Sequence, residues 1–141
     1  MRRIVKILGV AFLAVSLAAC ATLQATKAPS ADLSTIKTVY VQKLEGDGNN
    51  VYQVITARLM AIGFKATTGA SADPPEPVDA IVTYVDRWTW DITPYMVRLN
   101  IQVRDCKTRA ILASGESYRP SLQRRSVHEM VAETLDAIFK R

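Results

Sequence analysis

The sequence predicts an α+β fold: an antiparallel sheet of four to five strands with two helices packed on one face, in the order β-α-β-β-β-β-α. Two apolar stripes with helical spacing lie within residues 51–62 and 127–138. Between them, residues 95–105 alternate between apolar and polar, which is typical of a strand with one buried face and one wet face. We therefore expect a meander of strands covered on one side.

The first expected strand spans residues 36–44 and has Val-Tyr-Val at its centre. Residues 45–50 have turn composition, and either of their two asparagines is placed to cap a helix over residues 51–62. Gly63 is a plausible left-handed stop for that helix. A short strand over residues 64–68 is expected to follow.

The second half of the chain predicts three longer strands and a helix. A proline-rich surface loop over residues 69–78 leads into a strand at 80–92, and a turn at Pro94 leads into the strand at 95–105. In that strand the alternation places one set inside (Tyr95, Val97, Leu99, Ile101, Val103) and the other outside (Met96, Arg98, Asn100, Gln102, Arg104). A hairpin loop at 106–108 then leads to a partner strand at 109–118.

The last expected helix begins with capping-box spacing between Ser126 and Glu129. Its apolar stripe consists of Val127, Met130, Val131, Leu135 and Ile138.

Residues 1–19 have the anatomy of an export signal. Basic residues come first, an apolar run from Ile7 to Leu17 follows, and small residues precede Cys20. The apolar run is shorter than the roughly 20 residues that a membrane-spanning helix needs. The alternative is an ordinary secretory signal with a cysteine after it by chance.

Leu17-Ala-Ala-Cys20 closely resembles the lipobox of bacterial lipoproteins. That resemblance implies a lipoprotein signal peptide over 1–19 and Cys20 as the lipid-attachment residue. The cysteine sulfur would carry a diacylglyceryl group, and the new amine an acyl chain such as palmitate. Two or more chains hold a protein stably, whereas one binds only marginally. By the same resemblance, Ala21 in place of aspartate implies sorting to the periplasmic face of the outer membrane rather than retention in the inner membrane.

The chain after the signal is expected to form a flexible tether followed by one domain. Residues 20–35 are small and polar and predict a lipidated N-terminus with a flexible tether, and residues 36–141 predict a single periplasmic domain. Of the 18 basic residues, three lie in the signal, which leaves 15 against 13 acidic residues. This near balance argues against a nucleic-acid partner.

Several short patterns in residues 36–140 are similar to a family of small outer-membrane lipoproteins of Gram-negative bacteria. They are Val39-Tyr-Val41, Gly46-Asp-Gly-Asn49, Leu59-x₃-Gly63-Phe64, Asp79-Ala80, Trp90-Asp91 and Asp105-x-x-Thr108. More distantly, the layout resembles the LPS-assembly lipoprotein and the penicillin-binding-protein activator lipoproteins. Those are short lipid-anchored domains that bind a larger protein, and no binding residue carries over from them.

Two groups of residues are candidates for a partner or ligand surface. Trp88 and Trp90 lie two apart on one expected strand, where they are either a binding anchor or, as we favour, core cover. Arg98 and Arg104, with the two amides between them, form a polar stripe. This stripe either binds an anionic partner or, as we favour, is a solvated sheet face.

Catalytic patterns are weak. His128 is the only histidine, and no nucleophile and orienting acid accompany it. Cys106 is an unsupported nucleophile, and no metal site or cofactor is predicted beyond the covalent lipid. Asp105 and Glu116, on neighbouring strands, are the better carboxylate pair for a glycosidase.

We therefore expect a lipid-anchored accessory or structural protein of the cell envelope that is not an enzyme and acts by contact with an envelope protein. The alternative is binding or sensing of an amphipathic envelope molecule such as lipopolysaccharide, peptidoglycan or lipid.

Overall fold

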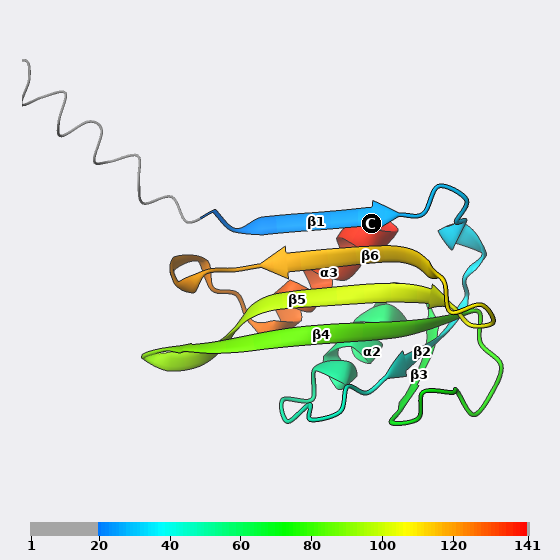
Figure 1. Cartoon of the computed structure of the whole chain (residues 1–141), viewed down its shortest axis with the longest axis horizontal. Helices are drawn as coiled ribbons and strands as arrows, with labels where there is room; N and C mark the ends of the chain where they lie inside the picture. Colours follow the sequence, from blue (N-terminus) through cyan, green and yellow to red (C-terminus); the bar gives the residue numbers. More distant parts are fainter. Residues whose placement is uncertain (1–19, 141) are drawn as a thin grey trace, which may run out of the picture.

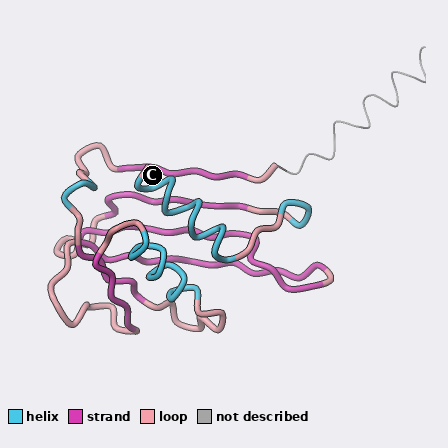
Figure 2. The backbone as a smooth tube through the Cα atoms, turned by 180° about the vertical axis from the view of Figure 1, so that it is seen from behind, coloured by secondary structure: helices cyan, strands magenta, loops and turns pink. Residues whose placement is uncertain are grey.

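The structure is a computed structural model that describes residues 20–140, so the predicted signal lies outside the described residues. It has two layers, a six-stranded sheet and two helices that lie on one of its faces (Figures 1 and 2). The class is therefore α+β with two helices, as the sequence predicts. No helix within residues 20–140 is long and apolar enough to cross a membrane.

The sheet differs from the prediction in size and direction, because it has six strands and is mixed rather than antiparallel. In space the order is β1-β6-β5-β4-β2-β3. Strand β2 runs parallel to both β3 and β4, and all other pairs are antiparallel. The strands are β1 (Thr22–Lys27), β2 (Thr38–Gln42), β3 (Lys65–Gly69), β4 (Ala80–Asp91), β5 (Thr93–Asp105) and β6 (Ile111–Tyr118).

The sixth strand lies where the sequence predicts a flexible tether. Strand β1 pairs with β6 along its whole length, from Thr22 opposite Tyr118 to Lys27 opposite Ala113. A short 3-10 helix, η1 (Leu33–Thr35), follows it. An edge strand needs only backbone partners on one side, so the polar sequence of β1 carries no alternation by which it could be recognised.

The parallel part of the sheet follows from helix α2 (Val51–Ala61), which crosses from β2 to the neighbouring β3. Its N-terminal cap is not an asparagine side chain, because Asn50 adopts a left-handed conformation and makes no side-chain cap. Asp47 accepts the N–H groups of Asn49 and Tyr52 at 3.0 and 3.2 Å. Gly63, with φ of 106°, ends the helix as predicted.

Strands β4 and β5 form a long hairpin with an irregularity that changes the predicted burial pattern. Arg87 pairs with Arg98, but the next residue, Trp88, pairs with Met96, so Val97 is an extra residue on β5. At the bulge and toward the hairpin tip, Met96 is buried and Val97 only half-buried, the reverse of the prediction. On the other side of the bulge, Leu99, Ile101 and Val103 are buried as predicted.

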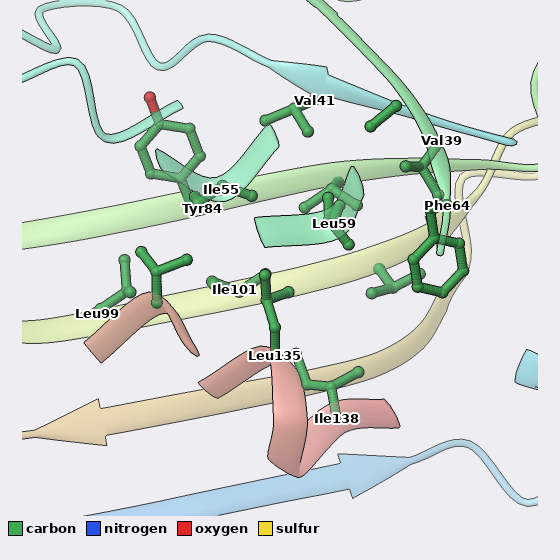
Figure 3. Packing of buried hydrophobic residues seen from close by; sticks show 14 of the residues in the cluster. Val39, Val41, Ile55, Leu59, Phe64, Tyr84, Leu99, Ile101, Leu135 and Ile138 are labelled. Carbon is green, nitrogen blue, oxygen red and sulfur yellow. The ribbon is translucent and has the colours of Figure 1, made fainter. Parts of the chain in front are cut away.

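Helix α3 (Val127–Phe139) begins with the predicted capping box between Ser126 and Glu129. It packs over β6 at Gly115, where an added Cβ would lie 2.8 Å from Ile138 Cγ1. The core lies between the sheet and the two helices and includes Ile55, Leu59, Leu99, Ile101 and Leu135 (Figure 3).

Candidate functional site: the anchor end and the open face

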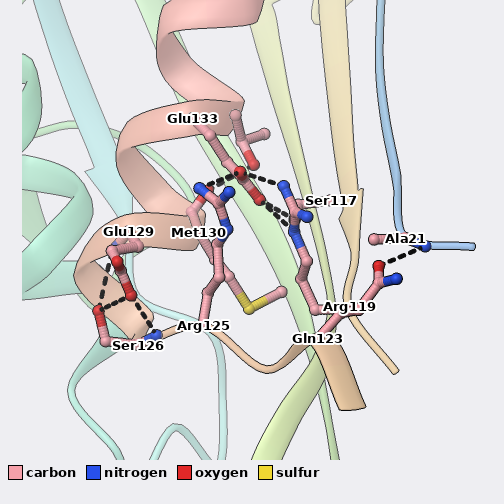
Figure 4. A network of polar contacts seen from close by, with 10 residues as sticks. Ala21, Ser117, Arg119, Gln123, Arg125, Ser126, Glu129, Met130 and Glu133 are labelled. Atoms are coloured by element: carbon pink, nitrogen blue, oxygen red, sulfur yellow. Dashed lines mark hydrogen bonds and ion pairs between the residues drawn. The ribbon is translucent and has the colours of Figure 1, made fainter. Parts of the chain in front are cut away.

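Cys20, the predicted lipid-attachment residue, is exposed at the start of β1. The backbone N–H of the next residue, Ala21, donates to Gln123 Oε1 at 2.9 Å (Figure 4). Gln123 belongs to η2 (Ser121–Gln123), the 3-10 turn between β6 and α3. Cys20 is therefore joined to the folded domain with almost no intervening chain.

The tip of the β4–β5 hairpin lies at this same end of the molecule and projects beyond the rest of the sheet (Figures 1 and 2). Large apolar side chains are exposed there: Trp90 is 72%, Ile92 87% and, on the adjacent η2, Leu122 92% exposed. We call Cys20, Trp90, Ile92 and Leu122 the anchor end.

Arg124 fixes the hairpin tip against η2. Its guanidinium donates to Thr93 Oγ1 at 2.8 Å and to the Asp91 carbonyl at 2.5 Å. It also lies over the Tyr95 ring, 4.1 Å from the centroid. Ser121 adds a hydrogen bond to the Asp91 carboxylate. These contacts hold the exposed side chains of the tip and of η2 beside one another.

The structure separates the two tryptophans. Trp88 is half-buried against the core, and its Nε1 donates to Asp86 Oδ2 at 2.7 Å. Trp90, two residues further along the same strand, extends past the end of the core into solvent. Trp88 therefore serves as core cover, whereas Trp90 is available as a contact residue.

A largely buried carboxylate, that of Glu133, joins β6 and the segment after it to α3. Glu133 accepts hydrogen bonds from Ser117 on β6 and from Arg119, and pairs with Arg125 at 3.1 Å (Figure 4). Burial alone would raise the pKa of Glu133, but the bonds from Arg119 and Ser117 outweigh it and hold the pKa below its usual range. The positive charges of Arg119 and Arg125 are thus partly neutralised within the fold.

The second candidate surface is the face of the sheet that no helix covers. We call it the open face, and in β4, β5 and β6 its side chains include Thr83, Val85, Arg87, Arg98, Asn100, Gln102, Arg104, Ser114 and Glu116. Arg98 and Arg104 both lie on it, as the alternation predicts.

Like charges face each other on the open face. Arg87 and Arg98 are directly opposed across β4 and β5. Arg98 forms a 3.3 Å ion pair with Glu116 and lies over the Tyr118 ring at 5.1 Å. Arg104 donates to Gln102 Oε1 at 2.5 Å. The face therefore has an excess of positive charge that one carboxylate only partly offsets.

The hollows of the open face are shallow. One of about 170 Å³ lies over Gln24, Asn100 and Glu116, and one of about 420 Å³ lies between Gln42 and Arg104. A hollow of about 340 Å³ on the helix side is lined by Thr26, Leu33 and the end of α3 from Ala137 to Lys140.

The predicted catalytic candidates are dispersed. Cys106 lies in the β5–β6 turn, and Asp105 Oδ1 accepts the N–H groups of Lys107 and Thr108 in that turn. Glu116 is opposite Asn100, five residues along β5 from Asp105. At about 3.4 Å a residue this is roughly 17 Å, well beyond the 5–9.5 Å that glycoside hydrolysis uses.

Within residues 20–140 no group of three His, Cys, Asp or Glu side chains is arranged to hold a metal ion. Three residues of these surfaces, Arg87, Ile92 and Leu122, are not predicted from the sequence. Arg87 has polar parity on a recognised strand and was open to prediction. Ile92 and Leu122 are single apolar residues in the hairpin turn and in η2, and only the fold brings these two segments to the end of the molecule at which β1 starts.

No protein-family model matches the sequence, and no curated protein matches it. Among solved structures, the PelC dodecamer from Paraburkholderia phytofirmans is similar, with a TM-score of 0.62 and 14% identity over 84% of this chain and 98% of that one. A PDZ domain protein from Parabacteroides distasonis gives a TM-score of 0.52 and 9% identity over 79% of this chain and 34% of that one. At these identities the likeness concerns the fold alone.

Proposed function

We propose that the protein is a lipid-anchored accessory protein of the cell envelope, held by Cys20 on the periplasmic face of the outer membrane, that acts by contact with another protein. The observation that supports the contact role best is the open face. It is broad and shallow, and it opposes Arg87 to Arg98. Like charges that face each other across strands destabilise a free protein, and an acidic partner would relieve that repulsion.

The proposal does not require an apolar interface, since non-obligate protein interfaces are about as polar as the rest of the surface. Arginine is enriched in such interfaces. The PelC structure that this fold resembles is a dodecamer. That assembly is consistent with a second copy of this chain as one possible partner.

Site-specific photo-crosslinking in intact envelopes tests the contact surface. A photoreactive phenylalanine replaces Val85, which is 61% exposed on the open face, and a matched control carries it at Ala57, exposed on α2. We expect a protein adduct of defined mass from position 85 and not from position 57. Adducts from position 57 alone would contradict the proposal.

Charge reversal then tests the chemistry. Arg87→Glu and Arg98→Glu are each expected to remove the adduct from position 85, whereas Lys65→Glu, on the outer strand β3, keeps it. If all three variants crosslink like the parent, the arginines do not recognise the partner.

A second candidate is binding of an amphipathic envelope molecule, which the 340 Å³ hollow between β1, η1 and α3 favours. It combines Leu33 and Phe139 with the charged side chains of Lys27 and Lys140. Recovery of lipopolysaccharide or lipid, rather than protein, from the crosslinked sample would favour this candidate.

The proposal includes the absence of hydrolytic activity. We expect the protein to leave purified peptidoglycan undigested. Digestion that Asp105→Asn and Glu116→Gln both remove would place an active site on the β5–β6 hairpin and refute this part of the proposal.

A further inference from the structure

The anchor end has exposed apolar side chains that do not pack into the core of the domain. Trp90, Ile92 and Leu122 are each more than two-thirds exposed, although large apolar side chains are normally packed. Single exposed apolar residues need no explanation, but these three belong to two segments that Arg124 and Ser121 hold together.

Ile92 bears a second cost. Its backbone has φ of 64°, a left-handed conformation that is a true outlier for a β-branched residue and that glycine or asparagine adopts far more readily. Because the Ile92 side chain is exposed, no packing within the domain offsets the free-energy cost of this backbone strain. The strained turn presents the isoleucine side chain at the very end of the hairpin.

The position of Cys20 indicates which surface Trp90, Ile92 and Leu122 contact. A short sequence of contacts leads from Cys20 to Ala21, from Ala21 to Gln123, and from its neighbours Leu122 and Ser121 to the hairpin tip. Consecutive Cα atoms are about 3.8 Å apart, so lipid chains on Cys20 enter the bilayer right beside η2. A domain joined so closely cannot turn its anchor end far from the membrane.

We propose that Trp90, Ile92 and Leu122 insert into the interface of the bilayer that holds the Cys20 lipid, as a second membrane contact that fixes the orientation of the domain. Tryptophan is enriched at membrane–water interfaces, and the two aliphatic side chains supply apolar surface beside it. Arg124 lies next to this contact, where anionic headgroups attract basic residues. This inference rests on the proposed lipidation of Cys20.

The chain has two tryptophans, and they provide a matched pair of probes. The mature lipidated protein is reconstituted into vesicles of phosphatidylethanolamine and phosphatidylglycerol whose acyl chains carry bromine, a quencher of tryptophan fluorescence. A Trp88→Phe variant reports on Trp90 alone, and a Trp90→Phe variant on Trp88 alone. We expect bromine to quench Trp90 strongly and Trp88 little, and aqueous iodide to lose access to Trp90.

The apolar neighbours are tested in the Trp88→Phe background. Ile92→Asn and Leu122→Asn together are expected to reduce bromine quenching of Trp90. The same change at Ile111, which is 44% exposed at the far end of the sheet, leaves quenching unchanged. Because asparagine tolerates the left-handed turn, Ile92→Asn should not lower the midpoint of urea unfolding. A merely structural role for Ile92 would lower it.

Flotation of the vesicles distinguishes the two proposals. Protein that does not float would refute lipid anchoring itself. Protein that floats while Trp90 is quenched no more than Trp88 would overturn the insertion and leave the anchor intact. Shielding of Trp90 from iodide in native envelopes, without quenching in protein-free vesicles, would also overturn it and assign the tip to a protein partner.

Discussion

At the scale of single residues, Asp47 shows how a buried carboxylate can organise a loop. It accepts the hydroxyl of Tyr84 at 2.6 Å as well as the N–H of Asn49 in the loop and the N–H of Tyr52 in the first turn of α2. Tyr84 in turn accepts the N–H of Leu44 at 3.1 Å. Burial and the nearby carboxylate raise the pKa of Tyr84, so it stays a hydroxyl donor. One residue therefore joins strand, loop and helix.

Asp47→Ala should lower the free energy of unfolding by about 2–4 kcal/mol, because the helix loses its cap and a buried tyrosine hydroxyl loses its acceptor. Asn49→Ala, two residues away and exposed, should cost at most about 0.5 kcal/mol. Urea unfolding followed by circular dichroism measures both. Equal losses would mean that an asparagine caps the helix after all.

The sequence predicts the turn at residues 45–50, but it does not predict which residue caps α2. Asp47, Asn49 and Asn50 are all common capping residues. The choice among them depends on Asn50 being left-handed and on Tyr84, which is 37 residues from Asp47. Local sequence carries neither fact, whereas the capping box at Ser126 is fully local and was confirmed.

At the scale of elements, the bulge at Val97 separates what alternation can and cannot predict. Alternation identifies the buried face of β5 from Leu99 to Val103. It fails toward the hairpin tip, because one extra residue moves the side chains between the bulge and the tip to the other face. No residue in Tyr95–Arg98 marks the bulge, and only the pairing with β4 reveals it.

The bulge predicts an inverted pair of mutational effects. Met96→Ala should lower the free energy of unfolding by about 2–5 kcal/mol, because Met96 is 2% exposed in the core. Val97→Ala should cost about 1 kcal/mol or less, because Val97 is only half-buried and loses one small apolar group. Urea melts of both variants check this. A larger loss at Val97 would restore the uninterrupted alternation and exclude the bulge.

The docking of α3 on β6 should depend on pH through Glu133. Its pKa is lowered in the folded protein, so its stabilising contribution is complete above the unfolded value near 4.5 and is lost as the pH falls through the folded value. Glu133→Gln should cost about 2–4 kcal/mol at neutral pH, since Arg119 loses its buried partner. The difference from wild type should shrink as the pH is lowered below about 4.5.

Unfolding in urea at several pH values measures this difference, and Glu116→Gln is the matched control. Glu116 pairs with Arg98 on the open face, where both side chains are about one-third or more exposed, so its loss should cost no more than about 1 kcal/mol. A Glu133→Gln difference that stays constant from neutral to acidic pH would show that the carboxylate charge is not what matters.

At the scale of the whole molecule, the consequential departure from the sequence prediction is β1. A polar segment after a predicted lipid-attachment cysteine is naturally interpreted as a tether, and its composition favours that interpretation. In the fold, β1 completes the sheet beside β6 and contacts α3. This leaves almost no free chain between Cys20 and the folded domain. The open face runs along the strands, away from the end of the molecule at which β1 starts (Figure 1).

Hydrogen exchange distinguishes the strand from a tether. Amides of residues 22–28 should include slowly exchanging positions, because β1 is paired to β6 and the Ala28 N–H donates to the Leu112 carbonyl at 2.8 Å. Ala70, Ser71 and Ala72, exposed in the loop that precedes the prolines, provide the fast reference within the same molecule. Peptide-resolved mass spectrometry of the mature protein measures both segments. If residues 22–28 exchange as fast as the loop, β1 is not stably paired with β6. Cys20 would then be separated from the domain by a flexible tether, and nothing in the fold would direct Trp90 toward a membrane.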